Sequence, residues 1–248
     1  MKKQKNNTIT ELSVADHLKE LKSRIVVSVI YFIIFFIINL YYSNNLMNFI
    51  LKIGNNANYQ FIYLAPQEIL IQQIKLAGTF ALLCSIPIIL YECIQFIAPV
   101  FIEKKHAVIH MIMLEIIGLI MFFIGLVFAY KILLPFTFSY LHDIGNSTNI
   151  QAQISIEKYI SLFITIMICI GSIFEIPLIS IMLTKIGLIS SSLMKKGQNI
   201  AIVIIFIIAA IVTPPDVVSQ CIVAIPMIIL YKISILLCKM IEKRKENS

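Results

Sequence analysis

Residues 157–183 read EKYISLFITIMICIGSIFEIPLISIML and decide the fold of this chain. From Tyr159 to Leu183 the stretch is apolar nearly throughout, and about 20 apolar residues are enough for a helix to cross a bilayer. One carboxylate, Glu175, lies well inside it, two residues before Pro177. A charged side chain at membrane depth costs about 3 kcal/mol on insertion scales, so such residues usually serve a function. The stretch therefore predicts a membrane span that holds a polar group inside the membrane.

The composition indicates that the whole chain is an integral membrane protein. Of its 248 residues, 59% are hydrophobic and only 13% are charged, which is more apolar surface than a soluble core needs. The length suits one bundle of about six helices with short loops. We therefore predict an all-α membrane protein with a single polytopic domain, residues 1–248. The expected segments are an amphipathic amino-terminus at 1–24, spans near 25–42, 74–98, 108–134, 157–183, 199–213 and 217–237, and a polar tail at 238–248.

Lysine and arginine gather in the segments that lie on one side of these spans. Fifteen of the 20 lie in residues 1–24, in the turn 99–106, in the connector 185–196 and in the tail. Cytoplasmic loops of membrane proteins carry an excess of Lys and Arg. We therefore expect both termini to be cytoplasmic and the loops at 43–72 and 136–155 to be external.

The segment before the first span reads as the start of an amphipathic helix. Ser13 and Asp16 have the spacing of a capping box, and Leu18, Leu21 and Ile25 continue an apolar stripe. The plain alternative is a charged helix that lies on the membrane surface.

Three features set the expected loops and the last hairpin. The first external loop holds one amphipathic piece at 46–53, and the third span should close at Pro135. The fifth span has thirteen apolar residues, or about 20 Å of helix against a hydrocarbon core of about 30 Å. We expect short fifth and sixth helices, joined by the turn 213–216, that are half-buried in protein or lie where the bilayer is thin.

Patterns of catalysis and metal binding are absent from the sequence. There is no catalytic triad order, HExxH, Walker loop or EF-hand, the four histidines are scattered, and the five cysteines show no CxxC spacing. Basic residues form only short clusters at helix ends, which does not suggest nucleic-acid binding. We therefore predict no enzyme activity, no cofactor, no metal and no nucleic-acid partner.

The intramembrane carboxylates leave two interpretations open. Glu175 is either a structural carboxylate bonded to a neighbouring helix, or a polar point in a groove that receives a polar ligand. Pro177 could bend the span into a concave wall. Glu115, in the third span, has no assigned role.

Five short motifs, in order, give the sequence a familiar pattern. They are HLKELKSR at 17–24, FIAP at 96–99, GLVFAY at 125–130, FEIP at 174–177, and TPPDVVSQ at 213–220 with AIP at 224–226. In this order on a six-span frame, the chain resembles the TatC family, the receptor subunits of the twin-arginine protein translocase. The resemblance covers about residues 13–240.

The resemblance implies a fold and a function. TatC-like proteins form a cupped bundle of six helices, bind signal peptides with consecutive arginines on the cytoplasmic side, and work with small single-span TatA- and TatB-type subunits. Folded proteins then cross the membrane, driven by the proton-motive force. Self-association is also expected.

By motif, the resemblance assigns roles to residues of this chain. Glu20 would contact the signal arginines, since two parallel hydrogen bonds match a carboxylate to a guanidinium. The other expected signal-peptide residues are His17, Lys22, Arg24, Phe96, Glu103 and Lys105. Glu175 and Pro177 would form the intramembrane groove. The external hairpin would comprise Pro214, Pro215, Asp216 and Gln220.

Two positions depart from the family pattern. Lys22 stands where the family usually has Arg, which keeps the charge but loses the planar fork. Lys105 stands where the family usually has a glutamate, and Glu103 is the nearest acid. Either Glu103 substitutes from a shifted place, or the site relies more on Glu20.

We therefore predict a non-enzymatic receptor and scaffold of the twin-arginine translocase. The membrane would be the bacterial inner membrane, with a plastid thylakoid or mitochondrial inner membrane as the alternative. The rival prediction is a small secondary transporter that uses Glu175 as a proton or cation site. An intramembrane enzyme is a third class, without a residue set to support it.

Overall fold

The computed structural model of the chain describes the backbone of residues 2–56, 59–97, 107–146, 153–213 and 217–246. Side chains are described for 18–56, 59–96, 114–143, 153–185, 187–213 and 217–243. The predicted site residues Glu103, Lys105, Pro214, Pro215 and Asp216 lie outside the described residues, and so does the side chain of His17.

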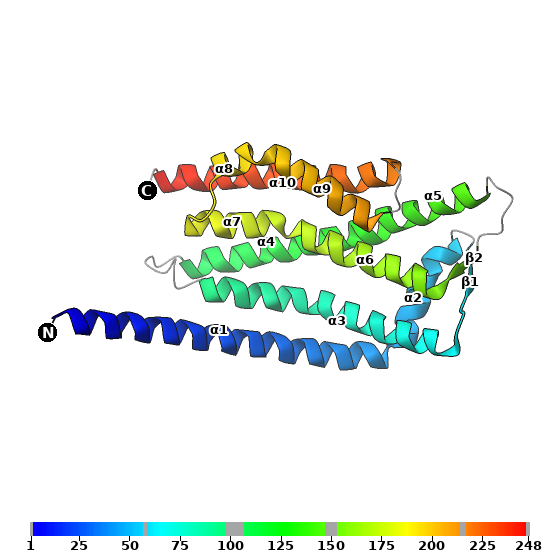
Figure 1. Cartoon of the computed structure of the whole chain (residues 1–248), viewed down its shortest axis with the longest axis horizontal. Helices are drawn as coiled ribbons and strands as arrows, with labels where there is room; N and C mark the ends of the chain where they lie inside the picture. The colour runs from blue at the N-terminus through cyan, green and yellow to red at the C-terminus, as the bar shows by residue number, and fades with distance from the viewer. Residues whose placement is uncertain (1, 57–58, 98–106, 147–152, 214–216, 247–248) are drawn as a thin grey trace.

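The described chain is almost entirely helical and forms one elongated bundle (Figure 1). Its elements are α1(Lys2–Tyr41), α2(Ser43–Asn56), β1(Gln60–Ile62), α3(Pro66–Ile97), α4(Ala107–Phe128), η2(Ala129–Leu133), α5(Leu134–Asn146), β2(Gln153–Ser155), α6(Ile156–Phe174), α7(Ile176–Ile186), α8(Ser191–Lys196), α9(Gln198–Val212) and α10(Val217–Glu246).

The two ends of the bundle differ in content. The start of α1, the end of α10 and α8 lie together at one end, which we name the terminal end (Figure 1). The opposite end carries α2 with the strands β1 and β2, and we name it the strand end (Figure 1). The termini therefore lie at the same end of the bundle.

Five helical segments among the described residues are long and apolar enough to cross a membrane, and α9 is a shorter apolar helix. They are Leu18–Tyr41, Pro66–Phe96, Leu114–Asp143, Ile156–Lys185 and Val217–Lys243. The predicted fold class, an all-α membrane protein, is confirmed. The count of six spans and the cytoplasmic termini stay predictions.

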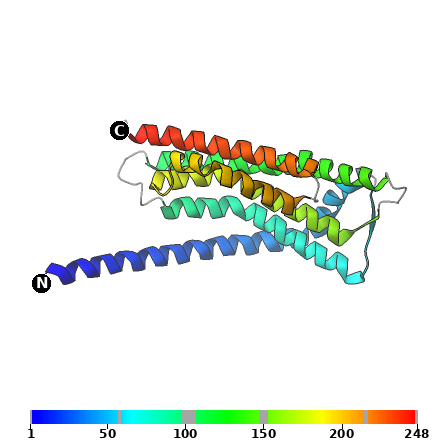
Figure 2. The same ribbon diagram turned by 45° about the horizontal axis from the view of Figure 1, so that its top comes forward.

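The centre of the bundle is α6, which contacts α3, α4, α7, α9 and α10. Its buried side chains recur every three or four residues, as expected for one face of a helix. They include Ile156, Tyr159, Ile160, Phe163, Ile166, Met167, Ile170, Ile173 and Phe174. By contrast, α1 lies on the outside of the bundle beside α3 (Figures 1 and 2), and α3 contains Pro87 and is bent (Figure 2).

The predicted fourth span consists of two helices, α6 and α7, joined at Glu175. α6 ends at Phe174, Glu175 forms the turn, and α7 starts at Ile176 with Pro177 in its first turn. The proline ring has no N–H to donate and disfavours a helical residue before it. The candidate span Ile156–Lys185 therefore agrees with the predicted one at 157–183, and it bends close to Pro177, where we expected a bend.

The third predicted span continues past Pro135, where we expected it to close. The N–H of Leu134 bonds to the carbonyl of Ala129, so η2 is a π-helical turn. Such a turn changes the hydrogen-bond pattern ahead of the proline, which donates no bond of its own. The helix then runs on as α5 to Asn146. The predicted loop at 136–155 was therefore wrong for residues 136–146, which are helical.

The amino-terminal segment is continuous with the first span. α1 begins at Lys2, well before Ser13, so the predicted capping-box start was wrong. The segment is also no separate surface helix, since it joins the span without a break (Figure 1). No Gly or Pro occurs between Lys2 and Tyr41 to interrupt it.

The residues 43–72, predicted as a loop, are largely ordered secondary structure. They hold α2, which includes the predicted amphipathic piece at 46–53, then β1 and the first turns of α3 from Pro66. β1 pairs in parallel with β2, Gln60 opposite Gln153. This pairing joins two connections that are distant in the sequence.

Glu68 and Tyr159 hold the strand end together. The Glu68 carboxylate accepts hydrogen bonds from the N–H of Leu64, the hydroxyl of Ser155 and the N–H of Glu157, at 2.8–2.9 Å. Tyr159 is fully buried; its hydroxyl donates to the Ile50 carbonyl at 2.8 Å and accepts from the Gly54 N–H at 3.0 Å.

A second tyrosine at the strand end closes α5 onto the loop before β1. The Tyr59 hydroxyl donates to the carbonyl of Phe138 at 3.0 Å. Burial, with a smaller contribution from the Asp143 carboxylate, raises the pKa of Tyr59. The phenol therefore stays protonated and remains a donor at neutral pH.

The last two helices differ from each other in length. α9 has 15 residues, about 22 Å at about 1.5 Å per residue, as expected for a short fifth helix. α10 has 30 residues, because the basic tail after Leu237 continues the helix. The expectation of a short sixth helix was therefore wrong for the helix as a whole.

Replacing Tyr159 by Phe tests the buried hydroxyl at the strand end. Tyr159→Phe leaves a buried carbonyl and a buried N–H without their partner, and we expect a loss of about 1–3 kcal/mol of stability. Tyr63→Phe is the matched control, because Tyr63 is 57% exposed. Thermal unfolding followed by far-UV circular dichroism in detergent compares them. An equal midpoint for both variants would contradict the assigned role of the hydroxyl.

Candidate functional site

Three charged side chains meet between α1 and α3 near the terminal end. Glu20 and Arg24 are one turn apart on α1, and the guanidinium Nη2 lies 2.6 Å from Glu20 Oε1. Its Nε donates to the same oxygen at 3.1 Å. Its Nη1 reaches across to Glu92 Oε2 on α3 at 2.9 Å. Arg24 therefore holds one carboxylate from each helix.

The cluster is half-buried rather than solvated. The side chains of Arg24, Glu20 and Glu92 are 21%, 34% and 16% exposed. Charge-assisted hydrogen bonds in such surroundings are stronger than bonds between neutral groups. Two carboxylates face one guanidinium, so these three side chains carry an excess of one negative charge.

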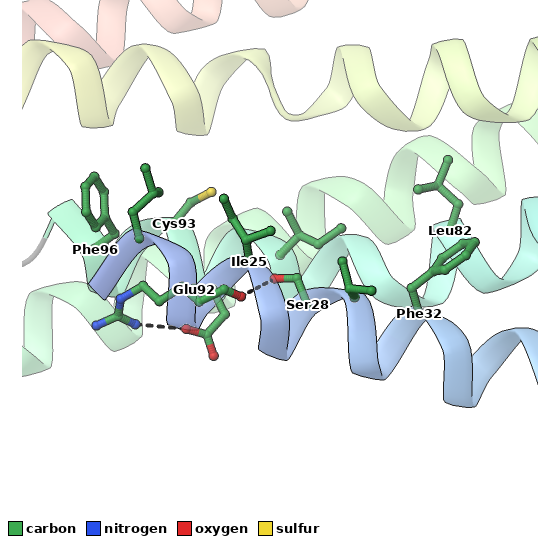
Figure 3. Close-up of a pocket in the computed structure, with 11 residues that line it drawn as sticks. Ile25, Ser28, Phe32, Leu82, Glu92, Cys93 and Phe96 are labelled. Atoms are coloured by element: carbon green, nitrogen blue, oxygen red, sulfur yellow. Dashed lines mark hydrogen bonds and ion pairs between the residues drawn. The ribbon is translucent and has the colours of Figure 1, made fainter. Parts of the chain in front are cut away.

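An apolar cavity of about 360 Å³ adjoins the cluster between α1 and α3. Figure 3 shows Glu92 and Phe96 toward one end of it and Phe32 and Leu82 toward the other. The lining comprises Leu21, Arg24, Ile25, Ser28, Val29 and Phe32 from α1, and Leu82, Ile89, Glu92, Cys93 and Phe96 from α3. The Ser28 hydroxyl donates to the Arg24 carbonyl at 3.0 Å, so the surface offered by the cavity is mostly hydrocarbon.

The structure brings together three residues that the sequence predicted for one site. Glu20 and Arg24 form the ion pair, and Phe96 lines the adjoining cavity. Lys22 is exposed on α1 and is not part of the lining. His17 also lies on α1.

Glu175 occupies a different place, in the middle of the bundle. It is 3% exposed, and neither carboxylate oxygen has a hydrogen-bond partner among the described residues. One oxygen lies close to Gly118 of α4, near Leu178. Pro177 follows in the first turn of α7. Glu175 is not part of the lining of the cavity between α1 and α3, and its membership of a groove stays a prediction.

Two glycines of α4 let the bend at Glu175 approach closely. A Cβ on Gly118 would lie 2.5 Å from Leu178 Cδ2, and one on Gly125 would lie 2.6 Å from Phe174 Cγ. The ring of Phe174 also lies tilted against that of Phe128, with ring centroids 5.9 Å apart. Two of the motifs found in the sequence, GLVFAY and FEIP, therefore contact each other directly.

The described part of the predicted external hairpin is held by Gln220. Its side-chain N–H donates to the carbonyl of Phe206 at 2.9 Å, which ties the start of α10 to α9. The hydroxyl of Thr213, which follows α9, donates to the Ala209 carbonyl. Among the described residues, both hydrogen bonds therefore have a structural role.

Sequence reasoning missed Glu92 and Glu68. Glu92 lies inside the predicted second span, so a carboxylate near the end of an apolar run was the available signal. Glu68 lies two residues after Pro66, and its partners from β2 and α6 are 87 and 89 positions away. No local pattern could have revealed them.

These features define a class of protein. It is a polytopic helical membrane protein that carries a half-buried charged cluster beside an apolar cavity at one end of the bundle. A bend with a buried carboxylate lies within its most central span.

Comparison with known proteins identifies the family. The family model described as Sec-independent protein translocase protein (TatC) matches residues 16–226. The chain is 36% identical over 232 residues to the TatC protein of Helicobacter pylori strain J99, covering 94% of this chain and 91% of that protein. It is 33% identical over 239 residues to TatC of Rickettsia prowazekii, covering 93% and 94%.

The fold agrees with the sequence match. A crystal structure of the twin-arginine translocase receptor TatC has a TM-score of 0.79 and 32% identity to this chain, covering 90% of this chain and 98% of that one. The chain belongs to the TatC family of Sec-independent protein translocase proteins. It is an integral membrane protein of the twin-arginine translocation system, and that family is a protein translocase family. The resemblance drawn from the five motifs is confirmed.

Gly125→Ala tests the close contact between α4 and the bend. The new methyl group would overlap Phe174, and we expect a loss of about 1–3 kcal/mol of stability. Gly78→Ala is the matched control, since its methyl group would lie 3.8 Å from Phe36 and a helical Gly→Ala change favours the helix by up to about 1 kcal/mol. Thermal midpoints in detergent should fall for the first variant only. Equal midpoints would show that the contact is loose.

Glu175→Met tests the absence of a partner for the buried carboxylate. Burying a polar group without a hydrogen bond costs about 1–3 kcal/mol, so the unbranched apolar side chain should raise the thermal midpoint. Glu68→Gln serves as the contrast, because Glu68 has three donors and its replacement should lower the midpoint. A midpoint that falls for Glu175→Met would show that another group stabilises the carboxylate.

Proposed function

We propose that this chain is the receptor and scaffold subunit of the twin-arginine translocase. It binds signal peptides with consecutive arginines on the cytoplasmic side and helps folded proteins cross the membrane, driven by the proton-motive force. The observation that carries the proposal is the carboxylate of Glu20, which lies in a half-buried cluster beside an apolar cavity.

The chemistry of this cluster suits a peptide of that kind. A guanidinium binds a carboxylate through two parallel hydrogen bonds, which a lysine ammonium cannot do. Arg24 makes a contact of this type with Glu20 within the chain itself, through Nε and Nη2. A signal peptide would offer the same group, followed by apolar residues that the cavity can receive.

The distribution of charge supports the proposed orientation. Both termini lie at the terminal end of the bundle (Figure 1), together with α8, which carries Lys195 and Lys196. By the positive-inside rule this end is cytoplasmic. The relatives in Helicobacter and Rickettsia are bacterial, which favours a bacterial inner membrane over an organelle membrane.

We propose that the partners are small single-span subunits of the TatA and TatB type, and further copies of this chain. Apolar side chains along α9 such as Ile200, Val203, Ile207 and Ile211 are exposed, and they suit lipid or another apolar helix. The length of α9 also supports a locally thinned bilayer.

The rival function is a secondary transporter, and one observation favours it. Glu175 is a buried carboxylate without a hydrogen-bond partner among the described residues, as a proton or cation site would require. The membership of the TatC family favours the receptor. We infer that the chain acts without catalysis of its own.

The proposal predicts that Glu20→Gln impairs export. In cells whose only TatC is this protein, a folded reporter with a twin-arginine signal should be exported at least about tenfold more slowly, since one good charge pair accounts for about 1.5 kcal/mol or more. Glu157→Gln is the control, because Glu157 is 57% exposed at the opposite end. Unchanged export by a Glu20→Gln, Glu103→Gln double variant would sink the proposal.

A further inference from the structure

The cluster at the terminal end contains a carboxylate that the sequence motifs did not assign. The sequence left open whether Glu103 supplies a second acidic contact or the site relies more on Glu20. Within the described residues, the acid that shares Arg24 with Glu20 is Glu92 of α3. Its Oε2 is 2.9 Å from Arg24 Nη1, and its side chain lines the apolar cavity.

We propose that Glu92 is a specificity-determining residue: it provides the second carboxylate that distinguishes arginine from lysine in a bound peptide, and the adjoining cavity takes an apolar side chain that follows the arginines. This inference rests on the proposed function, which it extends from Glu20 on one helix to a site built by α1 and α3.

The Glu92 carboxylate has room for a further hydrogen-bond donor. The bond from Arg24 engages only Oε2 of Glu92, and Glu92 makes no other hydrogen bond among the residues that the structure describes. A carboxylate has about four lone-pair sites, so Glu92 retains acceptor capacity for a second guanidinium.

The placement of Arg24 makes the site preformed. It spans from α1 to α3 and fixes both carboxylates, so a peptide need not order them on binding, which favours affinity. Arg24 is accordingly a positioning residue. The guanidinium of a ligand would add to the pair without breaking it.

The cavity gives the same site an apolar part. Its volume of about 360 Å³ is within the range of ligand pockets, which are mostly apolar with a few placed polar groups. Leu21, Ile25 and Val29 line it from α1, and Ile89 and Phe96 from α3. An arginine at the carboxylates would place the next side chains at the mouth of this cavity.

A purely structural role for Glu92 makes a different prediction. If the Arg24–Glu92 pair only clamps α1 to α3, then its loss should weaken the binding of every peptide to the same extent. A recognition role should instead change the preference for arginine over lysine. The discriminating quantity is therefore the ratio of two affinities.

The test measures the binding of two fluorescent peptides to the full-length protein in detergent. One carries two arginines followed by leucines, and the other carries two lysines in their place. Glu92→Gln should weaken the arginine peptide by about tenfold or more and leave the lysine peptide nearly unchanged. Glu115→Gln, which alters a half-buried carboxylate on α4 outside the cavity lining, should change neither.

The outcomes separate this inference from the proposed function. If Glu20→Gln weakens the arginine peptide while Glu92→Gln does not, the second carboxylate lies elsewhere and the inference is wrong, but the receptor function stands. If Glu92→Gln weakens both peptides equally, Glu92 is a clamp and the inference is again wrong. If the wild-type protein does not prefer arginine, the proposed function fails together with the inference.

A second measurement needs no variant of a charged residue. Cys84 and Cys93 are both exposed on α3, but only Cys93 is part of the cavity lining. An arginine peptide with an activated disulfide on the residue after the arginines should form a mixed disulfide with the protein. The adduct should persist in Cys84→Ser and vanish in Cys93→Ser. An adduct that depends on Cys84 instead, or no adduct under conditions where the peptide is bound, would overturn the assignment of the cavity.

Discussion

The constraint on which this structure depends is the free-energy cost of placing charge in an apolar helical bundle. Carboxylates lie at three places in the bundle, and their hydrogen bonding differs. At the strand end, Glu68 accepts three hydrogen bonds and joins α3 to the start of α6. At the terminal end, Glu20 and Glu92 share one arginine. In the middle, Glu175 has no partner among the described residues. A fully bonded carboxylate such as Glu68 is typical of structure, whereas Glu92, bonded through Oε2 to Arg24, keeps acceptor capacity for a further donor.

Much of the fold could be predicted because hydrophobic length and charge bias act locally. The apolar runs predicted helices, and the basic clusters predicted an end that holds both termini. What failed depended on hydrogen bonding around prolines and on tertiary contact. Pro135 was expected to end the third span. The helix continues instead, because the π-helical turn η2 changes the hydrogen-bond pattern just before the proline, which has no N–H to donate. Pro177 was expected to bend the fourth span, and the span does bend there, with the turn at Glu175, two residues before the proline. The strand end was read as loop, because its pairing joins segments far apart in the sequence.

The candidate site was likewise predicted only in part from the sequence. Glu20 and Arg24 are four residues apart on one helix, and Phe96 belongs to a recognisable motif, so the sequence reached all three. Glu92 lies 68 residues from Arg24, and only the packing of α1 on α3 brings them together. The family resemblance pointed to the basic turn for a second acid, whereas the geometry offers one on α3. We therefore propose a receptor whose arginine-reading site lies between α1 and α3, while Glu175 lies apart from it at the bend between α6 and α7.

Site-specific photo-crosslinking to a signal peptide tests the central claim most directly. A photoreactive residue at position 21, which lines the cavity beside Glu20 and leaves that carboxylate intact, would be compared with one at position 157, at the opposite end of the bundle. An arginine-reading site between α1 and α3 predicts a crosslink from position 21 to a twin-arginine peptide, lost with the twin-lysine peptide, and none from position 157. Equal crosslinking of both peptides at position 21, or crosslinking only from position 157, would contradict such a site.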